Sequence, residues 1–239
     1  MKGAQLLYSG KAKSIYRGET PNRLIMEFRD DITAFDGTKK NVLSEKGAFN
    51  CCVSAFLFEL LEREGIRTHY LGRLDRTTML VKALTMIPLE VVVRNRAAGS
   101  IVRNFSFTEG QILNPPVIVI DLKDDSRHDP MLNDDLILAL KLVTPDELVE
   151  LKEIALAING TLSEFLDGQG ILLVDLKLEF GRAEGEITLG DEISMDSMRL
   201  WDKESGRSMD KDVYRFDKGD VVGTYRAVAR RITGGRCEV

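Results

Sequence analysis

The stretch Ile171-Leu-Leu-Val-Asp-Leu-Lys-Leu-Glu-Phe180 decides the fold of this chain. Its charged residues, Asp175, Lys177 and Glu179, alternate with apolar ones. A period of two predicts a β-strand with one polar and one apolar face. Two interpretations of the polar face stay open at this point: a half-exposed strand whose charges are solvated, or the wall of a functional site.

A hairpin partner follows this strand. Residues 181–185 begin and end with glycine, and 186–189 form a second short apolar run, which together predict a hairpin. The returning strand would carry Asp191, within Gly190-Asp-Glu192, back toward residues 175–179. Two carboxylates at that place would suit Mg²⁺, which takes few protein carboxylates and completes its shell with water and phosphate oxygens.

Working outward, the chain shows further strands and helices. Apolar and alternating runs predict strands at 14–17, 24–28, 78–84, 89–93 and 117–121. Helical spacing predicts helices over 49–61, 144–168 and 221–232. Thr144-Pro-Asp-Glu147 has the sequence of a capping box with proline in the first helical turn. A β-rich front followed by mixed elements predicts an α+β fold with a lobe boundary near 85–88.

Composition excludes several classes of protein. The chain has 239 residues, 44% hydrophobic and 30% charged, which is ordinary for a globular protein. Its net charge of −5 argues against broad nucleic-acid binding. The longest run without a charge, residues 47–58, is well short of the ~20 residues that cross a bilayer. With Lys11, Lys13 and Arg17 in place of an apolar signal core, we expect no membrane partner and a cytoplasmic location.

The three cysteines, Cys51, Cys52 and Cys237, support neither a disulfide framework nor a CxxC metal pair. We expect Cys51 and Cys52 to be core residues of the helix over 49–61 rather than redox groups. With only His69 and His128 besides, a zinc site has too few ligands. Any chemistry must therefore use Lys, Arg, Asp, Glu and backbone amides, a set that suits phosphate and magnesium.

Two basic motifs are candidate anion sites. In Ser9-Gly-Lys-Ala-Lys-Ser14, a glycine turn precedes Lys11 and Lys13, which point the same way in an extended chain. Such a loop could cover a polyphosphate, although solvated lysines are the commoner cause of the pattern. In Pro88–Ser100, Arg94 and Arg96 lead into Ala-Ala-Gly-Ser, small residues that permit close approach of a ligand. Arginine forks bind phosphate or carboxylate, and a structural ion pair explains them equally well.

A last motif joins Ser197–Asp202 to Met209–Asp212. Within it, Arg199 and Lys211 are candidate anion ligands, whereas we expect Trp201 to serve packing.

Taken together, these segments resemble the SAICAR synthetase family. The resemblance is carried by SGKAKSIY, MIPLEVVVRNRAAGS, HDP, LVDLKLEFG, GDE, RLWDKE and MDKD, and it spans almost the whole chain. It implies a two-lobe fold, loosely like protein kinases. Residues 1–85 would form a β-rich nucleotide-binding lobe and 86–239 a larger α/β lobe for substrate and metal, with ATP in the cleft between them.

The resemblance implies an ATP-dependent ligase of purine biosynthesis. ATP with Mg²⁺ would activate the carboxylate of the ribotide CAIR, through an acyl phosphate, for attack by the amine of L-aspartate. The products would be SAICAR, ADP and phosphate. The resemblance and the apolar helix surfaces together favour a homodimer.

The resemblance also implies roles for individual residues. The metal ligands would be Glu179 and Asp191. CAIR would contact Glu90, Arg94, Ser100 and Arg199, the two arginines and the serine binding its phosphate. Residues for ATP would be Lys11 and Lys13 at the phosphates, Val81, Lys82 and Leu84 at adenine through backbone groups, and Ile15, Leu24, Met86 and Leu178 around the ring.

Lys177 would approach the reacting carboxylate of CAIR and stabilise developing charge. Asp175 would act as a base for the amine or would orient Lys177. Candidate residues for aspartate are Lys123, Asp129 and Asp36-Gly37, whereas His128 would shape its loop. The chain has Ser194-Met-Asp196 where the family often has Ser-Pro-Asp; the change removes no charged contact.

Two other functions use the same residues. A small-molecule kinase would yield a phosphorylated product, whereas the ligase releases phosphate only when CAIR and aspartate are both present. A nucleotide sensor without catalysis would have lost the metal carboxylates or the lysines, and this sequence keeps them.

Overall fold

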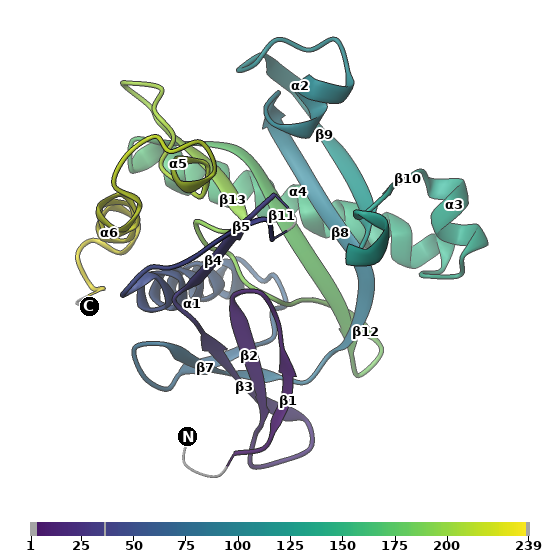
Figure 1. Ribbon diagram of the computed structural model, residues 1–239. Coiled ribbons are helices and arrows are strands. Elements are labelled where there is room, and N and C mark those ends of the chain that lie inside the picture. The colour runs from purple at the N-terminus through teal and green to yellow at the C-terminus, as the bar shows by residue number, and fades with distance from the viewer. Residues whose placement is uncertain (1–3, 36, 238–239) are drawn as a thin grey trace.

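Two antiparallel sheets form the frame of the computed structural model, which describes residues 4–35 and 37–237 (Figure 1). The first sheet has five strands in the order β1-β2-β3-β7-β6. Its strands are β1 (Leu6–Ser9), β2 (Lys13–Arg17), β3 (Arg23–Phe28), β7 (Thr78–Lys82) and β6 (Tyr70–Arg73). The sheet is therefore built from the front third of the chain, as its alternating pattern predicts.

Two residues separate the last strand of the first sheet from the first strand of the second. Its path is β10-β9-β8-β11-β12, and β13 pairs with β11 as well. The strands are β8 (Thr85–Arg96), β9 (Ile112–Leu122), β10 (Met131–Leu132), β11 (Ile171–Ala183), β12 (Glu186–Leu189) and β13 (Met198–Asp202). The predicted hairpin is β11–β12, with Phe180 opposite Leu189. The combination of antiparallel sheets with separate helices confirms the α+β class.

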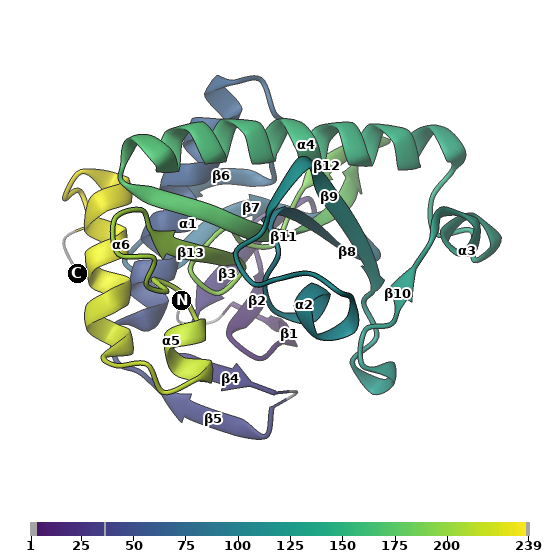
Figure 2. The ribbon, with the colours of Figure 1, turned by 90° about the horizontal axis from the view of Figure 1, so that it is seen from above.

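Helices cover the sheets on the sides away from their polar faces. Figure 2 shows α4 (Pro145–Gly168) lying across one face of the second sheet, while α1 (Lys46–Arg63) packs on the first sheet and against α6 (Val221–Thr233). The shorter elements are α2 (Ser100–Asn104), the 3₁₀ turn η1 (Asp125–Arg127), α3 (Asp134–Ala139), α5 (Asp212–Arg215) and the separate hairpin β4 (Asp31–Ala34) with β5 (Lys39–Val42).

Local sequence explains the ends of α4. The Thr144 hydroxyl accepts a hydrogen bond from the Glu147 amide at 3.2 Å, and the Glu147 carboxylate accepts one from the Thr144 amide at 2.8 Å. This is the predicted capping box, with Pro145 in the first turn. Leu148, Leu151 and other buried positions then pack α4 on β11 and β8.

Both faces of the central strand β11 are largely covered, so of the two interpretations left open, the half-exposed strand with solvated charges is wrong. Asp175 is 6% exposed and Glu179 is 4% exposed. Because β11 lies between β8 on one side and β12 and β13 on the other, its edges are paired too. The apolar face packs against α4, and the polar face lies beneath the front of the chain and lines the space between the two sheets.

Strand β9 starts earlier than predicted, at Ile112 rather than Val117. Pro115 and Pro116 therefore lie inside the strand instead of before it. They occupy a stretch where the β8–β9 register is irregular between Arg94 and Arg96, and β10 pairs only farther along, at Ile120 and Asp121. Proline is tolerated there because few ladder hydrogen bonds are lost.

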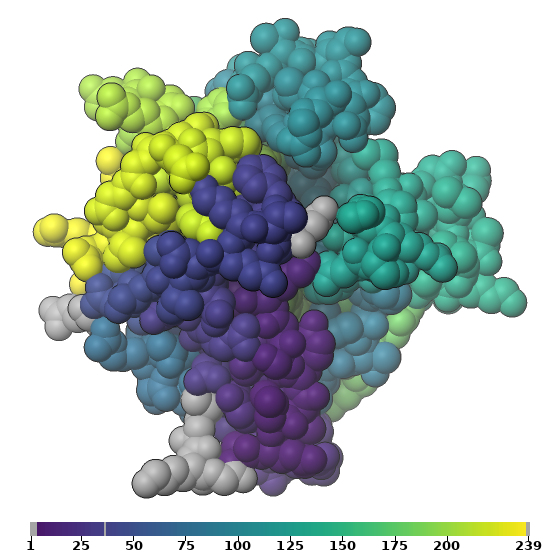
Figure 3. Space-filling view, in the orientation of Figure 1, coloured from purple at the N-terminus to yellow at the C-terminus, as the bar shows by residue number. Residues whose placement is uncertain are grey.

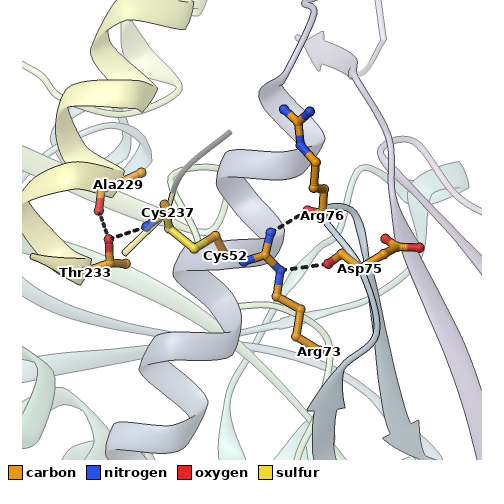
Figure 4. Close-up of a disulfide and its surroundings, with 7 residues drawn as sticks. All are labelled: Cys52, Arg73, Asp75, Arg76, Ala229, Thr233 and Cys237. Carbon is orange, nitrogen blue, oxygen red and sulfur yellow. Dashed lines mark hydrogen bonds between the residues drawn. A yellow bond between two sulfur atoms is a disulfide. The ribbon is translucent and has the colours of Figure 1, made fainter. Parts of the chain in front are cut away.

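The expectation that the cysteines form no disulfide is wrong. Cys52 on α1 and Cys237 after α6 are bonded, with their Cα atoms 6.0 Å apart (Figure 4). Their separation of 185 residues hides the pair in the sequence, because only the packing of α1 against α6 brings them together. Cys51 is buried and free as expected, and burial raises the pKa of its thiol to about 12.

Across the described ranges 4–35 and 37–237, no helix is long and apolar enough to cross a membrane.

Candidate active site

A polar cavity of about 460 Å³ lies between the first sheet and the polar face of the second. The β1–β2 turn lines it on one side, and β8 and β11 form its floor. Residues of β4 and α5 complete the wall. Figure 3 shows the surface hollowed where the front of the chain meets the segments around α2 and β10.

The register of β8 and β11 sets the floor of the cavity. Asp175 pairs with Arg94, Lys177 with Val92, and Glu179 with Glu90. Successive residues of a strand point to opposite faces, so these charged positions all share one face of the sheet. The apolar residues between them join the main core on the other face.

Lysines and carboxylates meet at one end of the floor. Lys13 Nζ lies 2.5 Å from Asp191 Oδ1 and 2.9 Å from Glu192 Oε1. Lys177 Nζ lies 2.6 Å from Glu90 Oε1 and 2.8 Å from Glu179 Oε1. The Gly190 amide donates to the Glu179 carbonyl at 2.9 Å, which places Asp191 beside Glu179 as the hairpin predicts.

Asp191 and Lys177 are charged at neutral pH. Burial by itself would raise the pKa of Asp191, but Lys13, Lys177 and Lys123 hold it well below its usual range. Burial opposes the charge on Lys177, yet Glu179 and Glu90 raise its pKa above the ordinary lysine value. Lys177 therefore stays protonated as an ammonium that can stabilise negative charge, and it is not a proton acceptor.

Arginines occupy the other end of the floor. Asp175 Oδ2 accepts hydrogen bonds from Arg94 at 2.8 Å and from Arg199 at 2.5 Å. Arg199 Nε also donates to Asp212 Oδ2 at 2.7 Å, and Arg94 donates to Ser100 Oγ at 3.0 Å. Two guanidinium groups are thus held side by side by shared carboxylates, a geometry suited to phosphate.

Gly99 allows this arginine pair to stay in place. Its backbone has φ 65°, a region that favours glycine. A Cβ built on it would lie 2.7 Å from Arg199 Nη2, closer than side-chain atoms normally approach. The small residues after Arg96 therefore do allow another group to come close to the backbone. That group is the guanidinium of Arg199, which belongs to the chain itself.

Ten of the candidate residues line the cavity together. They are Lys11, Lys13, Ile15, Glu90, Arg94, Asp175, Lys177, Glu179, Asp191 and Arg199. Ser100 joins them through its contact with Arg94. The others do not line it: Leu24, Val81, Lys82, Leu84, Met86 and Leu178. Val81 and Leu178 are 2% and 1% exposed, and Leu178 lies on the apolar face of β11, so neither side chain faces the cavity.

Two roles were considered for Asp175: a base for the amine, or a residue that orients Lys177. The ion pairs of the floor bear on the second role. The Asp175 carboxylate contacts Arg94 and Arg199, whereas within the described ranges Lys177 contacts Glu90 and Glu179. Among the aspartate candidates, Lys123, Asp129 and Gly37 line the cavity, and Asp36 lies outside the described residues. His128, at φ 58°, ends the η1 turn, in keeping with a loop-shaping role.

Sequence reasoning missed several parts of the wall, including Glu192, Arg215 and Thr33. Glu192 contacts Lys13, Arg215 enters from α5, and Thr33 lines the cavity from β4. Arg215 had a usable signal, because it follows Lys211 by four residues and helical spacing brings such pairs to one face. Thr33 had none, since a four-residue strand carries no charge pattern that points to a cavity.

Two carboxylates, and not a larger cluster, are available to a metal. Within 4–35 and 37–237, no group of three or more His, Cys, Asp or Glu residues is arranged to hold one. Glu179 and Asp191 are adjacent, and Asp191 is kept ionised. Such a pair fits Mg²⁺, which binds through one or two carboxylates plus phosphate oxygens and water.

Comparisons with known proteins match almost the whole chain and its fold. The family model described as SAICAR synthetase matches residues 6–232. A phosphoribosylaminoimidazole-succinocarboxamide synthase of Methanoculleus marisnigri is 64% identical over 232 residues, 97% of this chain and 96% of the relative. The corresponding Ehrlichia chaffeensis crystal structure has a TM-score of 0.94 at 40% identity, covering 96% of this chain and 98% of that one.

A third match bears on the nucleotide. A SAICAR synthetase solved in complex with ADP has a TM-score of 0.93 at 46% identity, covering 95% of this chain and 97% of that one. Fold, charged cleft and matches together define an ATP-dependent ligase. The chain belongs to the SAICAR synthetase family, which confirms the resemblance inferred from its motifs.

Proposed function

We propose that this chain joins L-aspartate to the carboxylate of CAIR, consuming ATP and releasing SAICAR, ADP and phosphate. The main observation in support is a single cavity with lysines paired to carboxylates at one end and a pair of arginines at the other. ATP and CAIR are both anionic, and they must meet at the carboxylate of CAIR. A cavity with cationic groups at both ends supports that arrangement.

The proposal places ATP at the lysine–carboxylate end. Lys11 and Lys13 would bind its phosphates, and Glu179 with Asp191 would hold Mg²⁺. Adenine would lie at the junction of the sheets, against Ile15, Leu24, Met86 and Leu178 and the backbone of Val81, Lys82 and Leu84. When bound, the metal neutralises charge on the phosphate oxygens. For the metal to bind, Lys13 would transfer from Asp191 to the phosphates.

CAIR would lie along the rest of the floor. Arg94, Arg199 and Ser100 would bind its phosphate, and Glu90 a polar group nearer the imidazole. Asp175 is then a positioning residue, because its contacts with both arginines fix their orientation. Its use as a base for the amine stays a prediction.

The reaction follows from this placement. A carboxylate oxygen of CAIR attacks the γ-phosphorus of ATP, the bond to the β-phosphate oxygen breaks, and ADP leaves. The amine of aspartate then attacks the acyl carbon, phosphate leaves with its bonding electrons, and the amine loses a proton. Lys177 would stabilise the oxyanion at the acyl carbon, an electrostatic effect worth about 10²–10³-fold in rate for one preorganised donor.

The proposal includes the two lobes and the assembly. Residues 1–85 would form the nucleotide lobe and 86–239 the substrate and metal lobe, a division supported by the change of sheet between Lys82 and Thr85. A homodimer is supported by exposed apolar side chains on α3, at its C-cap and on α4, namely Leu136, Leu140, Val149 and Leu156. Sedimentation of the purified protein tests the dimer. The cytoplasmic location stays a prediction.

Substrate omission tests the reaction. We expect phosphate release when ATP, CAIR, aspartate and Mg²⁺ are all present, and loss of release when any one is left out. A phosphorylated product formed without aspartate would favour the small-molecule kinase. Nucleotide binding without any turnover would favour the sensor.

A further inference from the structure

Lys46 lies at an unfavourable place for a lysine, because it is the first residue of α1 and is inside the protein. Its side chain is only 1% exposed, and a buried ammonium group costs free energy unless it is paired. The positive end of the helix dipole also opposes a cation there, and residues 46–49, the first turn, include no acidic residue. Glu45, the N-cap residue, pairs with Arg226 instead of capping the helix. The local structure of α1 therefore does not explain a lysine at this position.

The contacts of Lys46 lie outside its own helix. Its Nζ is 2.7 Å from Asp196 Oδ2 and donates a hydrogen bond to the Asp31 carbonyl at 2.8 Å. Asp196 Oδ1 accepts a hydrogen bond at 2.7 Å from the hydroxyl of Tyr225, which is fully buried on α6. Burial by itself would raise the pKa of Asp196, but Lys46, Lys211 and Tyr225 hold it well below its usual range. An ionised carboxylate is thus held from behind by α1 and α6, which pack against each other (Figure 2).

Asp196 belongs to a short turn, residues 192–197, that joins the lysine–carboxylate end of the cavity to the arginine pair. We call this segment the bridging turn. Its side chains brace one another: the Asp196 amide donates to Ser194 Oγ at 3.0 Å, and Ser194 Oγ donates to Glu192 Oε2 at 2.5 Å. Glu192 in turn contacts Lys13 at 2.9 Å. The conformation of the turn is therefore linked directly to the lysine that faces the cavity.

The bridging turn fixes the spacing of two groups that the proposed function uses. Asp191 comes immediately before it and Arg199 two residues after it. The Lys177 amide donates to the Ser197 carbonyl at 2.8 Å, which ties the end of the turn to the floor of the cavity. A shift of about 1 Å between reacting groups can cost about 10²-fold in rate. A loose turn would therefore affect turnover even where each substrate still binds.

We propose that Lys46 is a positioning residue that acts through Asp196. It holds the bridging turn so that Asp191 and Arg199 align ATP with CAIR for transfer of the phosphoryl group. This inference rests on the proposed function, because alignment matters only where two substrates react. Lys46 and Tyr225 do not line the cavity, whereas Asp196 does. A buried ion pair is by itself weak evidence for stability, so alignment accounts better for the cost of burying Lys46.

Steady-state kinetics of two variants test the proposal. We expect Lys46→Met to lower kcat about 10- to 100-fold, because the turn loses its anchor. The KM values for ATP and CAIR should change less than about threefold, since the groups that bind each substrate stay in place. Tyr225→Phe should lower kcat less, by under about tenfold, because Lys46 still holds one oxygen of Asp196.

Two matched controls separate alignment from the loss of any similar contact. Lys152→Met removes a lysine of α4 that pairs with Asp134 at 2.6 Å. Tyr70→Phe removes the hydroxyl of another buried tyrosine, which donates to Glu59 at 3.1 Å. Both controls should keep the parent kcat and KM values. A fall of kcat in the controls as large as that in Lys46→Met would overturn the proposal.

A double variant separates alignment from stability. Lys46→Met alone leaves a buried carboxylate without its cation, so its thermal midpoint should fall. Adding Asp196→Asn removes the second charge, and the thermal midpoint should then recover at least in part. On our proposal kcat stays low in the double variant, because the turn is still not anchored. If kcat returns to the parent value together with the thermal midpoint, the pair serves stability alone and the proposal is wrong.

Amide hydrogen exchange tests the turn without any turnover. The Ile193 amide donates to Ser54 Oγ at 2.9 Å and the Ser197 amide to the Ser194 carbonyl at 3.1 Å, so exchange in the parent should be slow. In Lys46→Met, or in the double variant if the single one does not fold, residues 192–199 should exchange about tenfold faster. Exchange at the parent rate would overturn the proposal. If the parent itself releases no phosphate with all substrates present, the proposed function fails, and exchange still decides whether Lys46 holds the turn.

Discussion

The two ends of the cavity hold their charges in different ways. At the lysine end, Lys13 and Lys177 each reach two carboxylates, and flexible ammonium groups can move between partners. At the arginine end, Arg94 and Arg199 share Asp175, and Asp212 holds Arg199 from a second direction. A planar guanidinium fixed by carboxylates keeps its geometry, whereas an ammonium acts as a movable point charge.

The difference suits two kinds of ligand. A metal and a leaving phosphate change position and charge during turnover, so their site benefits from partners that can exchange. The phosphate of a ribotide stays bound while chemistry occurs elsewhere, so its site benefits from rigid forks that are oriented beforehand. Four sets of substitutions test this contrast.

The largest effect is expected from Asp175→Asn at the arginine end. Removing the carboxylate leaves the buried Arg94 and the half-buried Arg199 without their shared partner, which should lower the free energy of unfolding by about 3–5 kcal/mol. Thermal or urea unfolding followed by circular dichroism measures this. Asp134→Asn, which breaks an exposed pair with Lys152, is the control and should cost under about 1 kcal/mol. Equal stabilities for the two variants would contradict a rigid arginine end.

At the lysine end, Glu179→Gln and Asp191→Asn should leave the fold intact and lower kcat about 10²–10³-fold. Extra Mg²⁺ should partly restore Asp191→Asn by mass action, but should not restore Asp175→Asn, which removes no metal ligand. The measurement is turnover against Mg²⁺ concentration. Glu186→Gln, on the exposed part of the same hairpin, is the control. Near-normal rates with unshifted Mg²⁺ curves would place the metal elsewhere.

Gly99→Ala should disturb the arginine end through a single methyl group. The left-handed backbone and the close approach to Arg199 predict a cost of about 1–3 kcal/mol and a raised KM for CAIR, with ATP unaffected. Gly185→Ala is the matched control, because Gly185 also has positive φ but nothing lies within 4 Å of the added Cβ. Stability should fall in both variants, and the KM for CAIR should rise in the first alone. A raised KM for CAIR in both variants would contradict a specific role of Gly99 at the arginine end.

The smallest effect is expected from Arg94→Lys and Arg199→Lys. Each keeps the charge and loses the two-pronged fork, so the KM for CAIR should rise about tenfold while nucleotide affinity is unchanged. Steady-state kinetics with each substrate varied in turn measures this, with Arg103→Lys on the exposed side of α2 as the control. An unchanged KM for CAIR together with weaker ATP binding would reverse the assignment of the two ends.

Much of the fold could be predicted because its signals are local. The capping box at Thr144, the period of two in β11 and the glycine turn of the β11–β12 hairpin each need fewer than a dozen neighbouring residues. The placement of Asp191 beside Glu179 followed from that hairpin. These are the features that the structure reproduces with nearly the predicted boundaries.

The rest depends on contacts between distant segments. Lys13 and Asp191 are 178 positions apart in the sequence, so their pairing leaves no pattern in either motif. The burial of the polar face of β11 was missed for the same reason, since the covering strands come from the front of the chain. The pairing of Cys52 with Cys237 likewise required the packing of α1 on α6.

The disulfide makes the chain from Cys52 to Cys237 a closed covalent loop (Figure 4). Strands β6 to β13 lie inside that loop, whereas β1, β2 and β3, with Lys11 and Lys13, lie outside it. A single protease cut within the loop would leave both fragments on one molecule until a thiol reductant is added, but a cut before Cys52 would free the front strands at once. Lys11 and Lys13 are thus the cavity residues whose covalent link to the rest of the site one backbone cleavage can break.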